Sequence, residues 1–493
     1  LSPPLTLSPP GCLVGRGLPT IFVETEERAL KKVLASKENK ARAEVVAVSP
    51  EGEETFTGVC SLRGRGNSTF ACAKRPFNLN FSHRVSLTLD GDSARQWCLL
   101  ANYADESQLH NAICFHVANT VGIPYTCRPE FVSLYVNGEY QGLYNLATKD
   151  ACLGQGGGEI ACVFERTREE RQHDATTPRG FCLRRRLGDR DSILRAVEAF
   201  EEALYSDTVS CEGLERYIDV GSLLRKCFVD EVCTNGDLSF SQYFTIDSEG
   251  RIAAACAWDY DLSFGTWYYP DLSYNTVVRT FPWYNALFER DDFRQGLLDM
   301  LSEYEDLLSA SFPALTDSLC RLVGEDWRMN ALRWRNAPPA WDGDSKLKAE
   351  GYDFGTLEGN KAYLDDFMAR RYAFLRDYWQ HPDEYCLLWF KHSLSGVTVA
   401  CRKGERLTED MLADGLLSMP EEGFEGWRNE EGVLLADVGE VWHDMTFEEL
   451  CSPEAQPSSP KLLTPKRLLL VALLLVLALS LAIALRLSCL KVN

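Results

Sequence analysis

Two aspartates stand two residues apart in the stretch Ala257 to Gly265, which reads AWDYDLSFG. In an extended segment, side chains at positions i and i+2 point to the same side. Asp259 and Asp261 can therefore converge on one cation. The alternative is a polar strand end that leads into a turn, and this stretch by itself leaves both interpretations open.

A second candidate site lies in a basic stretch of an acidic chain. The 493 residues include 72 Asp and Glu against 51 Lys and Arg, for a net charge of −21. This balance argues against nucleic acid as the main partner, because phosphate backbones bind to basic surfaces. Residues 55–89 nevertheless contain no Asp or Glu. The cations within this stretch are Arg63, Arg65, Lys74, Arg75 and Arg84. It is either a local anion site or a basic strand that pairs with acidic neighbours.

Strand patterns dominate the N-terminal half of the chain. Alternating and β-branched residues between positions 18 and 82 predict several strands. A helix is expected over residues 105–122, where apolar residues recur at helical spacing. The pair Asn137-Gly138 predicts the turn of a hairpin. These elements surround the basic stretch.

Helices dominate the following half, over residues 191–232 and 281–379, with the aspartate stretch between them. A mainly β half followed by a mainly helical half predicts an α+β fold of two lobes with a cleft between them. Residues 152–190 join the halves through a Gly- and Arg-rich connection, which is either a substrate loop or a solvated insertion.

The residue pattern changes in the C-terminal part of the chain. Residues 382–451 show short strands separated by turns and predict a small β module, and residues 452–467 form a linker of small and proline residues. Residues 468–485 are apolar except for Ser480, and a helix of this length spans roughly 27 Å, close to a bilayer core. We therefore expect a single-pass membrane anchor, followed by a short tail over residues 486–493.

Three further features bear on where in the cell the protein acts. Residues 1–17 form a Pro- and Gly-rich leader without the charged start and apolar run of a signal peptide. The 18 cysteines include neither a CxxC pair nor a Cys/His cluster at zinc spacing, so a structural zinc site is not expected. Many cysteines have apolar neighbours, as buried thiols do, and disulfides are left open. Lys and Arg flank both ends of the apolar run, so charge does not fix its orientation.

Four motifs give the chain a resemblance to a known family. LRGRGNSTFACAKRPFNLNF, LYVNGEYQGLYNL, TNGDLSFSQYF and AWDYDLSFG occur in the order and spacing of the spore-coat protein H (CotH) kinase-like family. From about Leu18 to Gln380, the chain resembles this family. The resemblance implies an atypical, two-lobed protein-kinase-like fold over residues 18–380. It also implies transfer of the γ-phosphate of ATP to a protein hydroxyl with Mg²⁺.

The resemblance assigns the basic stretch to the nucleotide. Phosphoryl transfer depends on positioning and on neutralising phosphate charge. Arg65 and Lys74 lie where the family has nucleotide-binding cations, and Arg75 stands beside them to assist. Without the resemblance, Lys74 can equally be a strand-edge residue.

The same resemblance separates the roles of three aspartates. Asp237, in NGDLSFSQYF, matches the catalytic aspartate that accepts the proton of a substrate hydroxyl. Asp259 and Asp261 would hold Mg²⁺, a hard cation suited to carboxylate and phosphate oxygens. The alternative for Asp237 is a turn cap that bonds its own backbone.

Three positions depart from the family pattern. Thr148 stands where a glutamate usually follows the GLY strand, Gln242 where an asparagine commonly follows the catalytic aspartate, and His110 where an arginine is usual. These changes keep a second hypothesis open, in which the chain is a catalytically degenerate surface adhesin or scaffold with a kinase-like fold.

The C-terminal module carries a weaker resemblance. GFEGWRNEEG and DMTFEEL, within residues 382–451, look like one copy of the Listeria-Bacteroides surface repeat, a small β-grasp-like unit of bacterial envelope proteins. This resemblance implies that the bulk of the chain faces outward from a bacterial membrane. The expected partners are ATP, a protein substrate and the membrane, but not nucleic acid.

Overall fold

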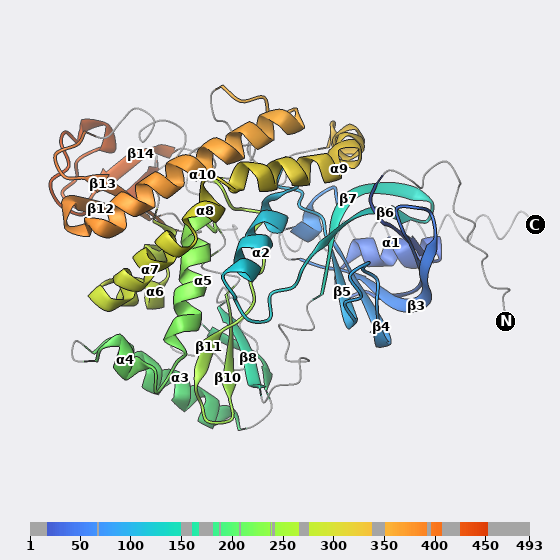
Figure 1. Ribbon diagram of the computed structural model, residues 1–493, viewed down its shortest axis with the longest axis horizontal. Helices are drawn as coiled ribbons and strands as arrows, with labels where there is room; N and C mark the ends of the chain where they lie inside the picture. The colour runs from blue at the N-terminus through green and yellow to red at the C-terminus, as the bar shows by residue number, and fades with distance from the viewer. Residues whose placement is uncertain are drawn as a thin grey trace, which may run out of the picture. The chain divides into compact units, whose positions relative to one another are not determined.

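The computed structural model describes most of residues 17 to 451 (Figure 1). The described residues are 17–66, 69–148, 160–166, 181–186, 189–206, 209–236, 238, 242–265, 276–337, 351–391, 396–406 and 424–451. The expected linker at 452–467, apolar segment at 468–485 and tail lie outside them, as does nearly all of the leader. Among the residues that are described, no helix is long and apolar enough to cross a membrane.

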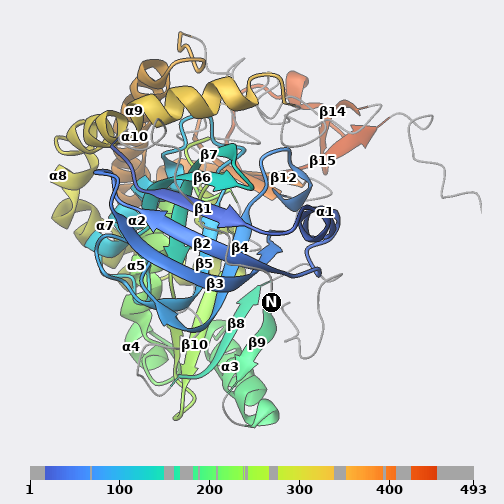
Figure 2. The ribbon, with the colours of Figure 1, turned by 90° about the vertical axis from the view of Figure 1, so that its right-hand side faces the viewer.

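The N-terminal half folds into a seven-stranded sheet that closes on itself, and its strands face the viewer in Figure 2. The strand order is β1-β2-β3-β4-β5-β7-β6, and β1 closes the sheet by pairing in parallel with β6. The strands are β1 (Thr20–Glu24), β2 (Ala41–Val48), β3 (Glu54–Gly64), β4 (Phe77–Val85), β5 (Ala94–Leu100), β6 (Glu130–Val136) and β7 (Glu139–Thr148). Helix α1 (Glu27–Ala35) follows β1.

Side-chain alternation explains why these strands enclose a core. Ile21 and Val23 of β1 are completely buried in one apolar cluster with Leu62 of β3 and Leu79 of β4, as period-two alternation requires. The predicted hairpin is confirmed: β6 and β7 are joined at Asn137-Gly138, and both residues have positive φ, the backbone that a two-residue turn of this kind demands.

A second, four-stranded antiparallel sheet has the order β11-β10-β8-β9. Its strands are β8 (Ile160–Arg166), β9 (Phe181–Arg186), β10 (Tyr243–Asp247) and β11 (Ile252–Ala254). Strands β8 and β9 lie in the stretch 152–190, which the sequence predicts only as a connection. Strand β8 pairs with β10, far along the chain, and β9 pairs with β8. A partner as distant as β10 leaves no local signal in the sequence.

Helices make up most of the remaining chain, as predicted. They are α2 (His110–Thr120), α3 (Arg190–Leu204), α4 (Cys211–Leu214), α5 (Val220–Val232), α6 (Pro282–Phe288), α7 (Asp291–Glu303), α8 (Glu305–Leu308), α9 (Phe312–Trp334) and α10 (Leu357–Gln380). Short 3-10 turns occur at η1 (Thr69–Ala71), η3 (Val277–Thr280), η4 (Pro382–Glu384) and η6 (Leu435–Asp437). Helix α5 packs beside α2, α7 and α10. The expected α+β class is thus confirmed, and the mixture of sheets and helices fits a kinase-like fold.

A buried ion pair fixes α10 against the end of α5. Arg371 lies 3.3 Å from a carboxylate oxygen of Glu231 and also donates to the Glu231 carbonyl, and both side chains are fully buried. Burial lowers the pKa of Arg371 to about 10, although the negative charge of Glu231 acts to raise it. Burial likewise raises the pKa of Glu231, although the positive charge of Arg371 acts to lower it.

A third sheet follows α10, with the order β13-β12-β15-β14. Its strands are β12 (Tyr385–Lys391), β13 (Gly396–Arg402), β14 (Phe424–Asn429) and β15 (Met445–Cys451). Leu387 and Ala400 from this sheet belong to the large apolar cluster of the helical half. The chain forms two compact units. The first comprises residues 1–419 and 427–448, and the second comprises residues 420–426 and 449–493. The site below lies entirely in the first unit.

Most described cysteines are buried free thiols, as their apolar neighbours indicate. Cys256 is disulfide-bonded, and among the free cysteines of the described chain only Cys320 is partly exposed.

Candidate functional site

The aspartate segment follows β11 and is not extended. Asp259 has a positive φ of 69°, and a turn begins at Asp261. The expectation that an extended backbone places both carboxylates on one side is therefore wrong. A non-glycine residue with positive φ costs about 1–3 kcal/mol and persists only where its surroundings enforce it. Asp261 is buried, whereas Asp259 is partly exposed.

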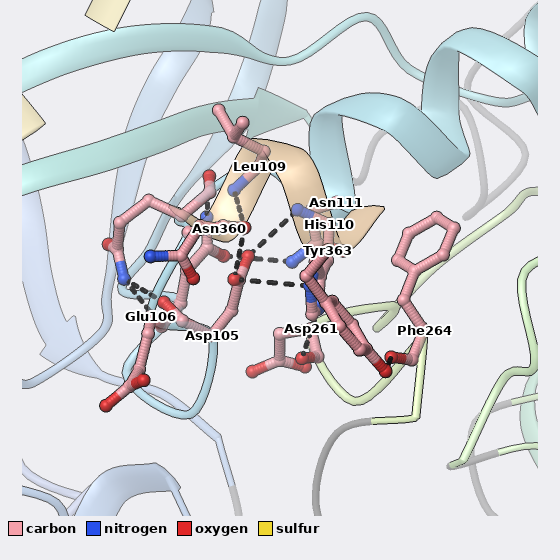
Figure 3. Close-up of polar contacts among 12 residues, drawn as sticks. Asp105, Glu106, Leu109, His110, Asn111, Asp261, Phe264, Asn360 and Tyr363 are labelled. Carbon is pink, nitrogen blue, oxygen red and sulfur yellow. Dashed lines mark hydrogen bonds and ion pairs between the residues drawn. The ribbon is translucent and has the colours of Figure 1, made fainter. Parts of the chain in front are cut away.

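The first turn of α2 holds this segment (Figure 3). The side-chain oxygen of Asn111 accepts a hydrogen bond from the backbone N–H of Tyr260 at 2.9 Å. The ring Nδ1 of His110 lies 3.2 Å from the carbonyl oxygen of Asp261. Both contacts act on the backbone, so α2 fixes the path of the segment where the turn begins.

Asp105 anchors the start of α2 from within the loop before it (Figure 3). Its carboxylate accepts the backbone N–H of His110 at 2.8 Å and the hydroxyl of Ser107 at 2.5 Å. The other ring nitrogen of His110 lies 3.4 Å from the same carboxylate. His110 therefore connects a buried acid to the backbone of Asp261.

Lys74 is buried, and its ammonium group lies among polar and aromatic partners. It donates to the side-chain oxygen of Gln108 at 2.7 Å and to the carbonyl of Leu143, and it lies 4.8 Å from the centre of the Tyr144 ring, within cation–π range. Burial lowers the pKa of Lys74 well below its usual range, and the charge of Asp105 opposes this shift.

Asp105 is thus an acid that interacts with Lys74, and the sequence analysis missed it. Thr148, where the family has a glutamate, pairs with Trp97 of β5 at the end of β7. An available signal was the position of Asp105 at the first residue of the predicted helix, where an acid can accept backbone N–H groups.

The two arginines of the basic stretch that were predicted as site residues, Arg65 and Arg75, make different contacts. Arg65 comes directly after β3 and its guanidinium carbon lies 5.3 Å from the centre of the Trp258 ring, next to Asp259 in the chain. Arg75 precedes β4, donates to the carbonyl of Phe70 and stacks over the Phe70 ring at 4.8 Å. Of these two arginines, the structure brings Arg65 directly against the aspartate segment.

Cys72 reports that charges from both stretches lie close together. Burial and, to a lesser extent, the charge of Asp261 raise the pKa of its thiol to about 11, and the charge of Arg75 opposes this shift. The basic stretch and the aspartate segment, which are far apart in the sequence, therefore face each other around Cys72.

Asp237 lies outside the described residues, but its neighbours are held against the aspartate segment. The backbone N–H of Gly236 donates to the carbonyl of Leu262 at 3.1 Å, and the N–H of Phe264 donates to the carbonyl of Cys233 at 3.0 Å. A Cβ added at Gly236 would lie 2.6 Å from the Leu262 oxygen. Only glycine permits this close approach.

A family comparison adds an independent observation. The model described as CotH kinase protein matches residues 62–150 and 163–375, which is more than half of the chain. The chain belongs to the CotH kinase protein family. No curated protein matches this CotH family member. The match ends before the C-terminal sheet, so the surface-repeat resemblance remains a prediction.

All six site residues predicted for this CotH family member fall within the matched residues. Five of them are described. Lys74 interacts with Asp105, Arg65 lies against Trp258, which directly precedes Asp259 in the chain, and the charges of Arg75 and Asp261 act on Cys72.

A magnesium ion would need oxygen donors in addition to the two aspartates. Within the described ranges, no three His, Cys, Asp or Glu side chains are grouped as a metal site. Gln242, directly before β10, is fully buried, and neither amide atom has a hydrogen-bond partner among the described residues. A buried amide without partners costs about 1–3 kcal/mol, and an amide oxygen is a ligand that Mg²⁺ accepts. The donor types present in this CotH protein fit the ion.

Proposed function

We propose that this chain is a protein kinase that transfers the γ-phosphate of ATP to a protein hydroxyl in the presence of Mg²⁺. One observation carries the proposal: Arg65 of the basic stretch lies 5.3 Å from the Trp258 ring of the aspartate segment, although the two stretches are distant in the chain. A metal-bound polyphosphate requires both kinds of group at one place. Membership of the CotH kinase protein family supports the same reaction class.

In this proposal the cations bind phosphate oxygens. Lys74 is held rigidly by Gln108 and the Leu143 carbonyl, so little side-chain entropy is lost when a phosphate arrives. Its ammonium is buried away from bulk solvent, and the lower local dielectric strengthens its attraction to an anion. Arg65 and Arg75 would add charge from the same stretch.

The carboxylates divide into metal ligands and an orienting base. Asp259 and Asp261, with the amide oxygen of Gln242, would hold Mg²⁺. The bound ion would neutralise phosphate charge as the bond to the leaving group breaks. Asp237 would orient the acceptor hydroxyl and take its proton.

The second candidate is a surface adhesin or scaffold that keeps the fold without turnover. Gln242 favours it, because its side chain is longer by one methylene than the family's asparagine. Thr148, which replaces the family's glutamate, favours the scaffold less than the sequence indicated. Asp105 supplies a negative charge that acts on Lys74 in place of that glutamate. The enzyme is therefore the function that we propose first.

We also propose that residues 468–485 anchor the protein in a bacterial membrane and that its bulk faces outward. The apolar composition of this segment and the resemblance of residues 382–451 to a surface repeat support this arrangement. A protein at the cell surface is the expected substrate class.

The function is tested by incubating the full chain with γ-labelled ATP, without a divalent cation, with Mg²⁺ or with Mn²⁺. We expect label on the chain itself or on casein only when a cation is present, and none with Asp237→Asn. ATP binding without any transfer would favour the scaffold. Absence of both binding and transfer would refute the kinase.

A further inference from the structure

A buried ion pair lies within α5, next to the proposed site. The ammonium of Lys226 lies 2.7 Å and 2.6 Å from the two carboxylate oxygens of Asp230, one helical turn later. Their side chains are 1% and 0% exposed. Removing two charges from water is costly, and an apolar pair of similar size is often equally stable. Stability alone therefore does not explain why this pair is present.

The same carboxylate binds both segments that carry the proposed site aspartates. Asn235, two residues before Asp237, donates its side-chain N–H to Asp230 at 2.9 Å. Tyr260, between Asp259 and Asp261 in the chain, donates its hydroxyl to Asp230 at 2.5 Å. Asp230 thus joins the loop before Asp237 to the aspartate segment.

The backbone bonds between the two segments are consistent with this link. Gly236 donates to the Leu262 carbonyl, and Phe264 donates to the Cys233 carbonyl. They keep the segments adjacent, but neither contact fixes a side chain. Asp230 adds a side-chain constraint from a rigid helix.

The tyrosines at Asp230 remain donors at neutral pH. A second tyrosine, Tyr284 of α6, donates to the other carboxylate oxygen at 3.4 Å. Burial raises the pKa of both Tyr260 and Tyr284 well above its usual range, and the charge of Asp230 raises it further. Neither phenol therefore ionises where it would repel the carboxylate.

We propose that Asp230 is a positioning residue, which holds the loop directly before Asp237 against the segment that carries Asp259 and Asp261. The inference rests on the proposed kinase function. It adds a residue that supports the site without contacting the reacting groups. Lys226 holds both oxygens of the Asp230 carboxylate in place through its hydrogen bonds to them. The remaining interpretation is an ion pair that only fills the core.

Two matched variants of the full chain separate these interpretations. Tyr260→Phe removes the bond from the aspartate segment, whereas Tyr284→Phe removes a bond to the same carboxylate from α6, which carries no site residue. Both substitutions leave a buried aromatic ring in place. Hydrogen exchange without nucleotide, followed by mass spectrometry, reports the amides of Gly236 and Phe264.

We expect these amides to exchange about tenfold faster in Tyr260→Phe and at the parental rate in Tyr284→Phe. We also expect the Mg²⁺ concentration for half-maximal ATP binding to rise about tenfold in Tyr260→Phe only. Equal exchange in the two variants would overturn the proposal. So would an unchanged Mg²⁺ dependence in Tyr260→Phe if the parent binds Mg-ATP.

A second variant, Asn235→Ala, keeps the proposal testable if Tyr260→Phe does not fold. If Tyr260→Phe melts without a native transition, Asn235→Ala removes the link from the other segment, and the same two shifts are expected. A parent that does not bind Mg-ATP refutes the kinase function, and the positioning role falls with it. The proposal alone fails if the parent binds Mg-ATP and both tyrosine variants behave alike.

Discussion

Lys74 has a charged group in a fully buried position, and its energetics depend on the few partners that reach it. The ammonium is surrounded by Gln108, the Leu143 carbonyl and the Tyr144 ring. Asp105 supplies a negative charge that favours the protonated ammonium. A buried cation with neutral hydrogen-bond partners retains most of its attraction for an anion. This arrangement suits a phosphate ligand.

Replacing Lys74 tests that role. We expect Lys74→Met to weaken ATP binding by about 1–3 kcal/mol, because it removes a charge-assisted hydrogen bond. Isothermal titration calorimetry with Mg-ATP provides the affinity. Arg84→Met, at an exposed cation of the same basic stretch, is the matched control and should bind as the parent does. Unchanged affinity in a folded Lys74→Met protein would remove Lys74 from the site.

Cys72 offers a measurement of the charges around it. Its thiol has a pKa raised to about 11 by burial and by Asp261. Asp261→Asn removes a negative charge, so the pKa should fall and the thiolate fraction near pH 9 should rise a few-fold, because one pKa unit is about a factor of ten. The rate of alkylation of Cys72 at pH 9, measured by peptide mass spectrometry, reports this change.

Cys60 serves as the internal reference for this experiment. Burial raises the pKa of its thiol to about 12 without a contribution from Asp261. Its alkylation rate should therefore be the same in both proteins. A Cys72 rate that does not increase would show that Asp261 does not lie near the basic stretch.

At the scale of elements, the contact between the loop before Asp237 and the aspartate segment depends on Gly236. We expect Gly236→Ala to separate them, since its Cβ would meet the Leu262 carbonyl oxygen at 2.6 Å. Thermal unfolding should show destabilisation of about 1–3 kcal/mol, and Mg-dependent ATP binding should be lost.

Gly324→Ala in α9 is the matched control. A Cβ there has no atom within 4 Å, so the exchange should stabilise the helix by about 0.5–1 kcal/mol and leave ATP binding unchanged. If Gly236→Ala also retained parental stability and Mg-dependent binding, the close contact between the two segments would be incorrect.

Local patterns identified some elements well. Asn137-Gly138 demands positive φ at both positions and therefore predicted the β6–β7 turn. Apolar spacing in residues 105–122 likewise predicted α2. These features depend on neighbours in the chain, which a single sequence displays directly.

Other features depend on distant partners and left little trace. The backbone after Asp259, which has a positive φ, is held by Asn111 and His110 of α2, so the i, i+2 argument for an extended segment failed. The pair Lys226 and Asp230 was visible as opposite charges one helical turn apart among apolar residues. Its connection to Tyr260, however, exists only in the folded chain. The identities of the candidate site residues were therefore easier to predict from the sequence than their positions in the fold.

At the scale of the whole molecule, α9 connects the closed sheet to the helical half. Trp334 donates to the Gln141 carbonyl of β7, and Asn330 accepts the backbone N–H of Leu143. Leu143 is also the residue whose carbonyl accepts Lys74. Helix α9 therefore supports the strand that holds the buried lysine.

Membrane attachment is a separate prediction at this scale. We expect protease added to intact cells to remove the chain before about residue 460, because an outward-facing protein on an anchor at 468–485 is accessible from outside. Immunoblotting for the soluble part measures the loss. Complete protection until the cells are lysed would contradict the outward orientation.

The central claim is that metal binding and hydroxyl orientation are separate tasks of different aspartates. Calorimetry with ATP, with and without Mg²⁺, tests it on Asp237→Asn, Asp259→Asn and Asp261→Asn, alongside transfer of labelled phosphate. Asparagine keeps the side-chain size, and melting curves without nucleotide control for structural damage. Asp259→Asn and Asp261→Asn should each lose Mg-dependent ATP binding, because a lost ligand removes the cation and its hold on the phosphates. Asp237→Asn should bind Mg-ATP as the parent does but transfer no phosphate. If all three variants bind Mg-ATP and transfer phosphate like the parent, the kinase account of these aspartates is wrong.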